Sequence, residues 1–521
     1  MSAKHGLTSS RSPVRSVAVS IKSPNAIAMA LLSANPRVGR SFFPVIVTFL
    51  FLLILYTSHA NVSSPFLDSI QIHLQPTAPK YKPLPTWTPP PISDPFPLLA
   101  TTDQDPPPIP HYNVPSPNLH ARYGLEKAPP LFIGFTRQWP MLLQAVVSYI
   151  TAGWPPSTIY VIENTGVHNK NKDGKLSLQN QFYLNHTTLK RLGVNVIQTP
   201  VLLTFSQMQN SFLSVAYNED QPYYFYSHQD ILVYSFENGK DTHKRPSDRE
   251  WEFYDDEEED EMMNPPAAGQ PGYKTIYENC LKDLQTVRKK QERWGFRFYQ
   301  YDHLTLVNRE AMEAVGGWDS MIPYYNSDCD LNGRMKMGGW TMKHRRVGII
   351  NDVSSNLDDL EVLYRNPQLK PSFTDPNPTT PVQVASDRAR EEAKLTAALD
   401  ANKTGSATSQ RDLPAIMPTD PLEYFQHLNK IGLQMGEHKY RKGNTWRNTW
   451  QSSQRGGIGE PYYYDPAGFA RAFEILTDAG RDIFREKWGH YDCDLDQGGT
   501  ALSLGDQWRV EKDYNDKKRR D

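Results

Sequence analysis

Between residues 131 and 337, short apolar runs alternate with longer amphipathic stretches. Compact runs rich in β-branched and aromatic residues suit buried strands, whereas apolar residues at every third or fourth position suit one face of a helix. Because strands that alternate with helices form βαβ units, we expect an α/β, Rossmann-like fold in which helices flank a mostly parallel sheet. The pattern predicts strands at 131–135, 158–162, 194–198 and 223–226, and helices at 140–151, 179–192 and 205–217.

The same pattern continues toward the C-terminus with two interruptions. Residues 237–272 contain seven consecutive acidic residues, and a block of like charge predicts a disordered insertion. Residues 366–418 are polar and proline-dotted, which is typical of a linker between a catalytic domain at 131–365 and an α-rich C-terminal region at 419–521. Further elements are expected as helices at 273–294, 309–315, 330–337, 421–439 and 466–487, and as a strand-rich segment at 296–307.

The N-terminus has the charge pattern of a membrane anchor. Residues 1–41 carry six basic residues and no acidic one, and an apolar run occupies residues 42–58. These features predict a cytosolic tail, a single-pass transmembrane signal-anchor of type II topology, and a lumenal remainder. A cleaved signal peptide that ends near Ala60 and a mitochondrial transit peptide are the alternatives. A signal-anchor and a cleaved signal peptide would both place the chain in the Golgi or another secretory-pathway membrane system.

Residues 59–130 predict a stem that follows the anchor. Eighteen of the seventy residues from Asn61 to Pro130 are proline, which prevents regular helix and favours extended polyproline segments. Asn61, Asn185 and Asn402 each begin an Asn-x-Ser/Thr sequon, as expected of a lumenal glycoprotein.

The overall composition narrows the possible partners. The chain has 56 basic and 58 acidic residues and a net charge of −2, so we expect no nucleic-acid partner. The three cysteines, Cys280, Cys329 and Cys493, lack the spacing of a zinc site. One pair could form a disulfide in an oxidising compartment, and the sequence leaves open which pair.

Polar residues follow the predicted strands, at the edge of the sheet where α/β proteins bind ligands. Thr136 and Arg137 follow the first strand, Glu163 and Asn164 follow the second, and the triplet 228–230 (His-Gln-Asp) follows the fourth. No Gly-rich phosphate loop follows any of these strands, which counts against an ATPase or a nicotinamide enzyme. A divalent cation held by a carboxylate is the usual alternative for binding a diphosphate.

Two groups of residues carry the candidate chemistry. Asp230 either caps backbone amides or holds a metal, and His228 is either a ligand or a packed core histidine. Asp328 and Asp330 lie at a predicted helix N-terminus, where the helix dipole favours the ionised form that a general base needs. One of these two acids could instead be the N-cap and the other a first-turn acid; we interpret Asp330 as structural and Asp328 as catalytic.

The order of these motifs resembles that of inverting glycosyltransferases of the GT-A fold. Residues 316–339, which begin Gly-Gly-Trp and continue to two aspartates and an arginine, are similar to the acceptor-side segment of β-1,4-galactosyltransferase-like enzymes. The resemblance implies that Asp328 is the catalytic base and that Asp330 is the last acid of the cluster. It also implies that Gly317 and Trp318 contact the donor, together with residues after the first two strands: Thr136, Arg137, Glu163 and Asn164.

The resemblance further implies a metal site. Asp230 takes the position of the metal-binding Asp in the family's Asp-x-Asp motif, while His228 replaces the first acid. His344 is the nearest candidate for a third ligand. The implied cofactor is Mn²⁺ or Mg²⁺.

The implied activity is transfer of a sugar from a nucleotide-diphosphate-sugar donor to a glycan, glycoprotein or lipid acceptor hydroxyl, with inversion of configuration. A non-catalytic Golgi relative that binds glycans or acts as a scaffold is the main alternative, since the metal motif departs from the family's pattern. A nucleotidyltransferase is a further alternative, which the missing Gly-rich loop disfavours.

Overall fold

The computed structural model describes residues 43–59, 78–81, 91–241, 264–374, 417–440, 457–460, 465–495 and 502–512 of the 521-residue chain. The chain divides into two units, Met1–Thr86 and Trp87–Asp521. In the first unit, helix α2 spans Phe43–His59. Among the described residues, which include most of the predicted anchor at 42–58, no helix combines the length and the apolar character that crossing a membrane requires. The predicted tail at 1–41 lies outside the described residues.

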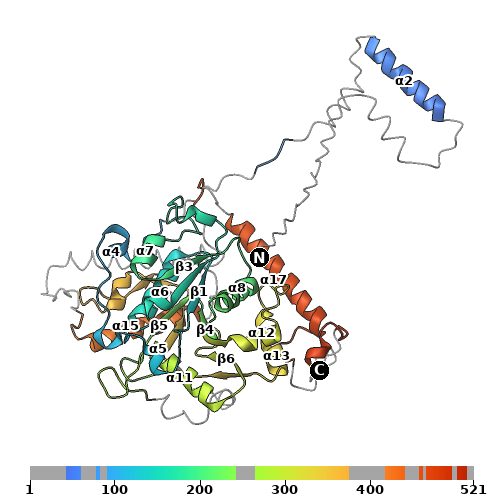
Figure 1. The fold of residues 1–521 in the computed structure, drawn as a ribbon. Coiled ribbons are helices and arrows are strands. Elements are labelled where there is room, and N and C mark those ends of the chain that lie inside the picture. The colour runs from blue at the N-terminus through green and yellow to red at the C-terminus, as the bar shows by residue number, and fades with distance from the viewer. Residues whose placement is uncertain are drawn as a thin grey trace, which may run out of the picture. The chain divides into compact units, whose positions relative to one another are not determined.

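The second unit is built on a seven-stranded sheet (Figure 1). The strand order is β3-β2-β1-β4-β7-β6-β8, and every neighbouring pair is parallel except the two pairs that involve β7. The predicted mostly parallel α/β sheet is therefore confirmed. The strands are β1 Leu131–Phe135, β2 Ile159–Glu163, β3 Asn195–Gln198, β4 Tyr223–Ser227, β6 Trp294–Phe298, β7 Leu304–Asn308 and β8 Thr341–His344.

Helices cover both faces of this sheet, because alternate residues of a strand point to opposite faces. Phe132 of β1 and Tyr224 of β4 pack in the core that includes helices α8, α12 and α13. Ile133 and Phe225 pack in the opposite core, with α6 and α11. These helices are α6 Trp139–Thr151, α8 Phe205–Asn218, α11 Ile276–Lys290, α12 Arg309–Val315 and α13 Ser327–Met337.

A small antiparallel sheet and the C-terminal helices complete the unit. Strands β5 (Ile231–Tyr234) and β9 (Ile349–Asp352) pair antiparallel, so that Ile231 lies opposite Asp352. Helix α15 (Pro421–Tyr440) packs on β9, and Phe425 and Met435 lie in the same core as β5 and α6 (Figure 1). The remaining named elements are β10 Asn356–Leu357, β11 Phe373–Thr374, α4 Pro97–Thr101, α5 Leu119–Arg122, α7 His186–Arg191, α17 Pro466–Trp488 and five short 3-10 helices among the described residues.

Most of the predicted elements agree with the structure to within three or four residues, but the helix predicted at 179–192 is wrong. Only α7, at His186–Arg191, is helical there. The side chain of Asn180 accepts a hydrogen bond from the Phe182 backbone N–H at 2.9 Å, and Asn185 caps α7 by accepting one from Thr188. Asparagine side chains that bind nearby backbone groups compete with helix formation, which explains the late start of the helix.

The predicted disordered insertion at 237–272 is also wrong at its edges. Glu237 is fully buried, forms an ion pair with Arg365 and accepts a hydrogen bond from the Tyr112 hydroxyl at 2.8 Å. Residues 264–272 are described as turns and bends, while residues 242–263 lie outside the described chain. Glu237 is therefore part of the core, because a buried carboxylate is paired there with a buried cation.

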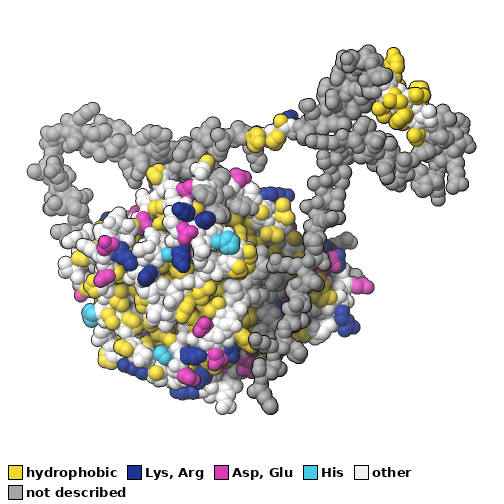
Figure 2. All heavy atoms as spheres, turned by 45° about the horizontal axis from the view of Figure 1, so that its top comes forward, with side chains coloured by type: hydrophobic (Ala, Val, Ile, Leu, Met, Phe, Trp, Pro, Cys, Tyr) yellow, Lys and Arg dark blue, Asp and Glu magenta, His cyan; other side chains and the backbone are white. Residues whose placement is uncertain are grey.

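The visible surface carries mixed charge. Figure 2 shows basic and acidic side chains interspersed on one face of the described chain, with no extended patch of one sign on that face.

Candidate functional site

The topology places a ligand site at the ends of β1 and β4. The chain adds β2 and β3 on one side of β1 and then continues with β4 on the other side, so the loops after β1 and β4 diverge from a switch point. Crevices at such points are where open α/β sheets bind ligands. The two loops touch: the side chain of Gln229, after β4, donates a hydrogen bond to the backbone carbonyl of Arg137, after β1, at 2.7 Å.

Three side chains at this edge form a candidate metal centre. His228 follows β4, and Asp302 and His303 lie on the hairpin between β6 and β7. Each offers one ligand atom, and these atoms lie within 4.8 Å of one another. Nε2 of His228 is 3.4 Å from a carboxylate oxygen of Asp302, yet this buried nitrogen makes no hydrogen bond with any described residue. A buried nitrogen that faces a carboxylate without a hydrogen bond to it is placed to bind a cation together with that carboxylate.

The second nitrogen of each histidine is oriented as in known metal sites. Nδ1 of His303 donates to the backbone carbonyl of Gln300 at 2.9 Å, and its Nε2 lies 3.5 Å from a carboxylate oxygen of Asp352. Nδ1 of His228 lies 3.8 Å from a carboxylate oxygen of Asp230. Metal-binding histidines usually present their other nitrogen to a carbonyl or a carboxylate in this way. Two imidazoles and one carboxylate therefore fit a divalent cation such as Mn²⁺.

The electrostatic field at the cluster is strongly negative. Burial would lower the pKa of His228, but Asp302, Asp230 and Asp352 outweigh it and raise the pKa to about 9. The pKa of His303 is raised as well, since the hydrogen bond and charge of Asp352 outweigh burial. A site that holds extra protons on its histidines is one that attracts cations.

Asp230 is engaged by a lysine instead of facing an open metal position. Nζ of Lys439, at the C-terminal end of α15, lies 2.9 Å from Oδ2 of Asp230 and forms a second ion pair with Asp352. The lysine is 3% exposed. Burial would lower the pKa of Lys439, but the two aspartates outweigh it and hold the pKa above its usual value. Asp230 therefore faces Nδ1 of His228, opposite the nitrogen that points to Asp302, and is not among the clustered ligands.

His344 lies away from the cluster. It ends β8, which pairs with β6, and β7 lies between β6 and β4. At a spacing of ~4.8 Å between strands, β8 is about 14 Å from β4. Its ring contacts Phe298, with the ring centroids 5.3 Å apart. His303, and not His344, therefore lies beside His228, at the position expected of the third metal ligand.

The two acids of α13 have different surroundings. Asp328 is half-buried, and one of its oxygens accepts a hydrogen bond from the Tyr301 hydroxyl at 2.9 Å. Tyr301 directly precedes Asp302 and has a left-handed backbone with φ of 43°, an uncommon conformation for a residue with a side chain. Such a conformation costs free energy and persists only where the surrounding structure holds it. The tyrosine therefore connects Asp328 to the hairpin that carries the metal cluster.

Asp330 is fully buried and has no open oxygen. One oxygen pairs with Arg334 at 2.7 Å, and the other accepts from the indole of Trp488 at 2.9 Å and pairs with Lys487 at 2.7 Å. A carboxylate held by two cations and an indole cannot accept a proton from a substrate. This geometry suits the structural role that we interpret for Asp330 from the sequence and argues against a catalytic one.

Three of the predicted donor-binding residues form hydrogen bonds within the protein: Glu163, Asn164 and Thr136. Asn171 and Gln198 donate to the two oxygens of Glu163, at 2.7 and 2.9 Å. Asn164 is buried, donates to Thr136 at 3.3 Å and exchanges two hydrogen bonds with the backbone of Leu203. Side chains paired in this way fix the loops after β1, β2 and β3. Direct contact of Glu163 or Asn164 with a donor would require these bonds to break.

Arg137 remains available to a ligand. The residue is 6% exposed, and its guanidinium stacks on the ring of Phe469 from α17 at 3.9 Å. In the part of the chain that the structure describes, the guanidinium forms no hydrogen bond or ion pair. Burial lowers the pKa of Arg137 to about 9, although the nearby Tyr324 raises it slightly. A buried cation without an anion is unfavourable, so this position suits the negative charge of a ligand.

The loop that carries Gly317 and Trp318 approaches the site from the α8 side. Asn210 accepts from the backbone N–H of Trp318 at 2.9 Å and donates to its carbonyl at 2.8 Å. Gly317 has φ of +68°, and a Cβ there would lie 2.8 Å from the Asn210 side chain, so a larger residue would displace this clamp. Trp318 packs edge-on against Phe205 at 5.2 Å, and Phe205 in turn packs edge-on against His228 at 6.5 Å.

One disulfide holds the C-terminal segment on α13. Cys329, between the two acids, is bonded to Cys493, while Cys280 is free and buried. The disulfide lies beside a small core formed by Ile322, Phe484, Trp488 and Leu495.

Five residues of the candidate site were not predicted from the sequence: Tyr301, Asp302, His303, Asp352 and Lys439. The run Tyr-Asp-His at 301–303 is the signal that could have identified the first three, because it lies between two apolar runs that form a hairpin. Lys439 lies in a helix with ordinary amphipathic periodicity, so no local pattern marks it.

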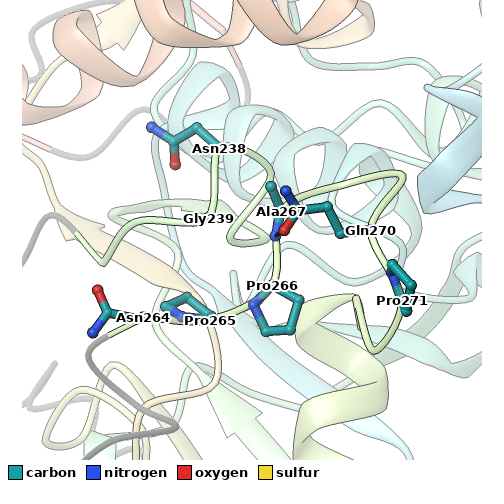
Figure 3. Close-up of a pocket in the computed structure, with 8 residues that line it drawn as sticks. All are labelled: Asn238, Gly239, Asn264, Pro265, Pro266, Ala267, Gln270 and Pro271. Atoms are coloured by element: carbon teal, nitrogen blue, oxygen red, sulfur yellow. Dashed lines mark hydrogen bonds between the residues drawn. The ribbon is translucent and has the colours of Figure 1, made fainter.

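A cavity of about 660 Å³ lies elsewhere, in the connection between β5 and α11. Figure 3 shows that turns around Asn238 and Pro266 line it. All eight lining residues are uncharged, so their side chains offer no general acid or base.

No protein-family model matches the sequence. No curated protein matches it significantly. Among solved structures, a mannosyltransferase from Pyrobaculum calidifontis in complex with GDP-Man and Mn²⁺ is similar at 10% identity and a TM-score of 0.25, over 44% of this chain and 61% of that one. The matched region thus spans less than two thirds of the mannosyltransferase. A cytidylyltransferase from Leptospira borgpetersenii is similar at 9% identity and a TM-score of 0.22, over 42% of this chain and 75% of that one. Likenesses this weak define no activity for the chain.

Proposed function

We propose that this protein is a metal-dependent glycosyltransferase that moves a sugar from a nucleotide-diphosphate-sugar donor to an acceptor hydroxyl with inversion of configuration. The observation that carries the proposal is the cluster of His228, Asp302 and His303 at the ends of β4 and β7, linked through Tyr301 to the half-buried carboxylate of Asp328. A candidate metal centre beside an accessible carboxylate is the pair of functions that such a transfer needs.

The metal ligands in this proposal are His228, Asp302 and His303. A divalent cation such as Mn²⁺ or Mg²⁺, when bound there, would neutralise the charge that develops on the departing diphosphate. The imidazole ligands favour Mn²⁺ over Mg²⁺, because Mg²⁺ prefers oxygen ligands.

Asp328 acts as the general base. One of its oxygens is held by the Tyr301 hydroxyl, and the other has no partner among the described residues, so it can accept the proton of the acceptor hydroxyl. The hydroxyl oxygen then attacks the anomeric carbon while the bond from that carbon to the nucleoside diphosphate breaks. A single displacement of this kind inverts the configuration at the anomeric carbon.

Arg137 and the Gly317–Trp318 loop form the donor side of the site. The guanidinium of Arg137 is buried and has no anionic partner in the described chain, which suits a phosphate of the donor. Glu163, Asn164 and Thr136 hold the surrounding loops, so their contribution to donor binding is one of positioning.

The site of action is a secretory compartment in this proposal. The bonded pair Cys329–Cys493 supports it, because disulfides form and persist in oxidising compartments. The acceptor is a glycan, glycoprotein or lipid hydroxyl.

The test is a hydrolysis and transfer assay with a panel of nucleotide sugars, with and without Mn²⁺, on the full-length chain. The variants are Asp302→Asn and Asp328→Asn, with Asp173→Asn, an exposed aspartate on a turn, as the matched control. We expect metal-dependent turnover of one donor, lost in Asp302→Asn. Transfer to acceptors is lost in Asp328→Asn, and the control keeps both activities.

The proposal is overturned if a folded wild-type chain turns over no donor with or without metal. Binding of a glycan without any turnover would instead identify a non-catalytic lectin-like protein.

A further inference from the structure

The ammonium of Lys439 occupies a position between carboxylates that a metal ion could take. Its Nζ contacts Oδ2 of Asp230, Oδ1 of Asp352 and the backbone carbonyl of Val353. All three contacts are to oxygen atoms, which are the ligands of hard divalent cations. The lysine is supplied by α15, 209 residues after Asp230 in the chain.

The two aspartates that Lys439 joins also face the candidate metal centre. Asp230 lies 3.8 Å from Nδ1 of His228, and Asp352 lies 3.5 Å from Nε2 of His303. Lys439 thus fixes both the carboxylate behind His228 and the carboxylate that faces Nε2 of His303. Without it, the carboxylates of Asp230 and Asp352, whose side chains are 9% and 10% exposed, would lie beside each other with no cation between them.

The charges of the cluster balance with one metal ion and one lysine. Asp230, Asp302 and Asp352 carry three negative charges. One divalent cation and the Lys439 ammonium supply three positive charges, with both histidines neutral as ligands. With Lys439 in place, a second divalent ion would leave the buried cluster with two excess positive charges, one more than in the absence of the lysine, which is unfavourable in a region of low dielectric.

We propose that Lys439 is a built-in cation that replaces a second metal ion, so that the protein binds one divalent cation at His228, Asp302 and His303 while the lysine holds the position between Asp230 and Asp352. This inference rests on the metal centre of the proposed function but not on sugar transfer. Removing the lysine should therefore open a second cation position.

A matched control exists in the same chain. Lys487, at the C-terminal end of α17, is also 3% exposed and also joins two aspartates, Asp319 and Asp330. It lies among Arg334 and Trp488 and contacts no histidine of the cluster. A Lys487→Met variant therefore removes an equivalent buried bridge without touching the candidate metal centre.

The experiment measures Mn²⁺ per chain by equilibrium dialysis for the full-length wild type, Lys439→Met and Lys487→Met. We expect one ion in the wild type and in Lys487→Met, and two in Lys439→Met. A double variant, Lys439→Met with Asp352→Asn, should return to one ion. The same number of ions in Lys439→Met and in the wild type overturns the proposal. A wild type that binds no ion counts against the metal centre of the proposed function, whereas the difference between wild type and Lys439→Met still decides the role of the lysine.

A folding measurement covers the case in which Lys439→Met does not fold in metal-free buffer. The variant is then refolded with millimolar Mn²⁺ and followed by near-UV circular dichroism. Recovery of the native spectrum supports the replacement of one cation by another. Failure to recover it, while Lys487→Met folds with or without Mn²⁺, overturns the proposal.

Discussion

The two C-terminal helices end in the same chemical arrangement with different neighbours. Lys439 of α15 and Lys487 of α17 are both 3% exposed, and each joins two aspartates of the α/β body. Around Lys487, the remaining lone pairs of Asp330 are taken by Arg334 and Trp488. Both oxygens of Asp330 therefore have partners, and the ion pair with Lys487 leaves no open ligand atom.

Around Lys439 the arrangement is incomplete. The two aspartates face His228 and His303, and Nε2 of His228 has no hydrogen bond among the described residues. A saturated buried bridge contributes to the structure alone, whereas one that leaves a neighbouring ligand atom open is suited to binding. The neighbours of a buried ion pair, and not the pair itself, therefore distinguish a structural site from a functional one.

The largest effect on stability should come from removing the disulfide near Lys487, Cys329–Cys493. Replacing Cys329 and Cys493 by serine removes a cross-link between residues 164 apart, which the chain-entropy model values at about 5 kcal/mol of unfolding free energy. We expect urea denaturation to show a loss of up to this size, with Mn²⁺ affinity unchanged. A loss of Mn²⁺ binding at unchanged stability would contradict the distinction between a structural region around Lys487 and a functional one around Lys439.

Asp330→Ala should destabilise the protein nearly as much. It leaves the buried cations of Arg334 and Lys487 without their shared carboxylate, and breaking a buried pair typically costs about 3–5 kcal/mol. Thermal and urea unfolding measure the effect. If the folded fraction of this variant loses transfer activity beyond the loss of folded protein, Asp330 has a role in the reaction that its contacts do not show.

Asp328→Asn should act on the reaction and leave stability unchanged. The side chain is half-buried and hydrogen-bonded only to Tyr301 among the described residues, while loss of a general base typically lowers the rate by about 10²–10⁴-fold. The check is kcat of the transfer reaction alongside Mn²⁺ affinity and melting temperature. A rate within a few fold of wild type would exclude Asp328 as the base.

The smallest effect is expected for Asp230→Asn. Asp230 supports His228 from 3.8 Å, and changes to such outer partners typically lower metal affinity about 10–100-fold. Isothermal titration with Mn²⁺ measures this change. An affinity loss much larger than that range would mean that Asp230 binds the ion directly, as the family resemblance implies.

Much of the fold could be predicted from local patterns. The strand at 131–135 and the helix at 309–315 agree with the structure residue for residue, because apolar periodicity and flanking polar residues mark their ends. The helix predicted at 179–192 was wrong because two asparagine side chains bind the backbone ahead of α7. Such side-chain caps are not visible in apolar periodicity.

The candidate site was only partly predictable, for a physical reason. His228 and Asp328 lie at strand and helix ends, where sequence position indicates the ligand edge of the sheet. Asp302 and His303 come from a hairpin that the sequence showed only as a strand-rich stretch, and Lys439 arrives from a helix more than two hundred residues away from its partner. Which distant side chains meet is decided by tertiary packing, so His344 was chosen where His303 lies.

The distance along the chain between Asp230 and Lys439 affects how the protein is made. Translation at ~5–20 residues per second delays the lysine by about 10–40 s after the aspartate has been synthesised. Until then Asp230 lacks this cation, and so does Asp352 from its own synthesis, 87 residues before the lysine, so the unfinished chain depends on water or cellular ions to neutralise this part of its core. Nascent chains arrested before α15 should therefore be more sensitive to chelators than the released protein.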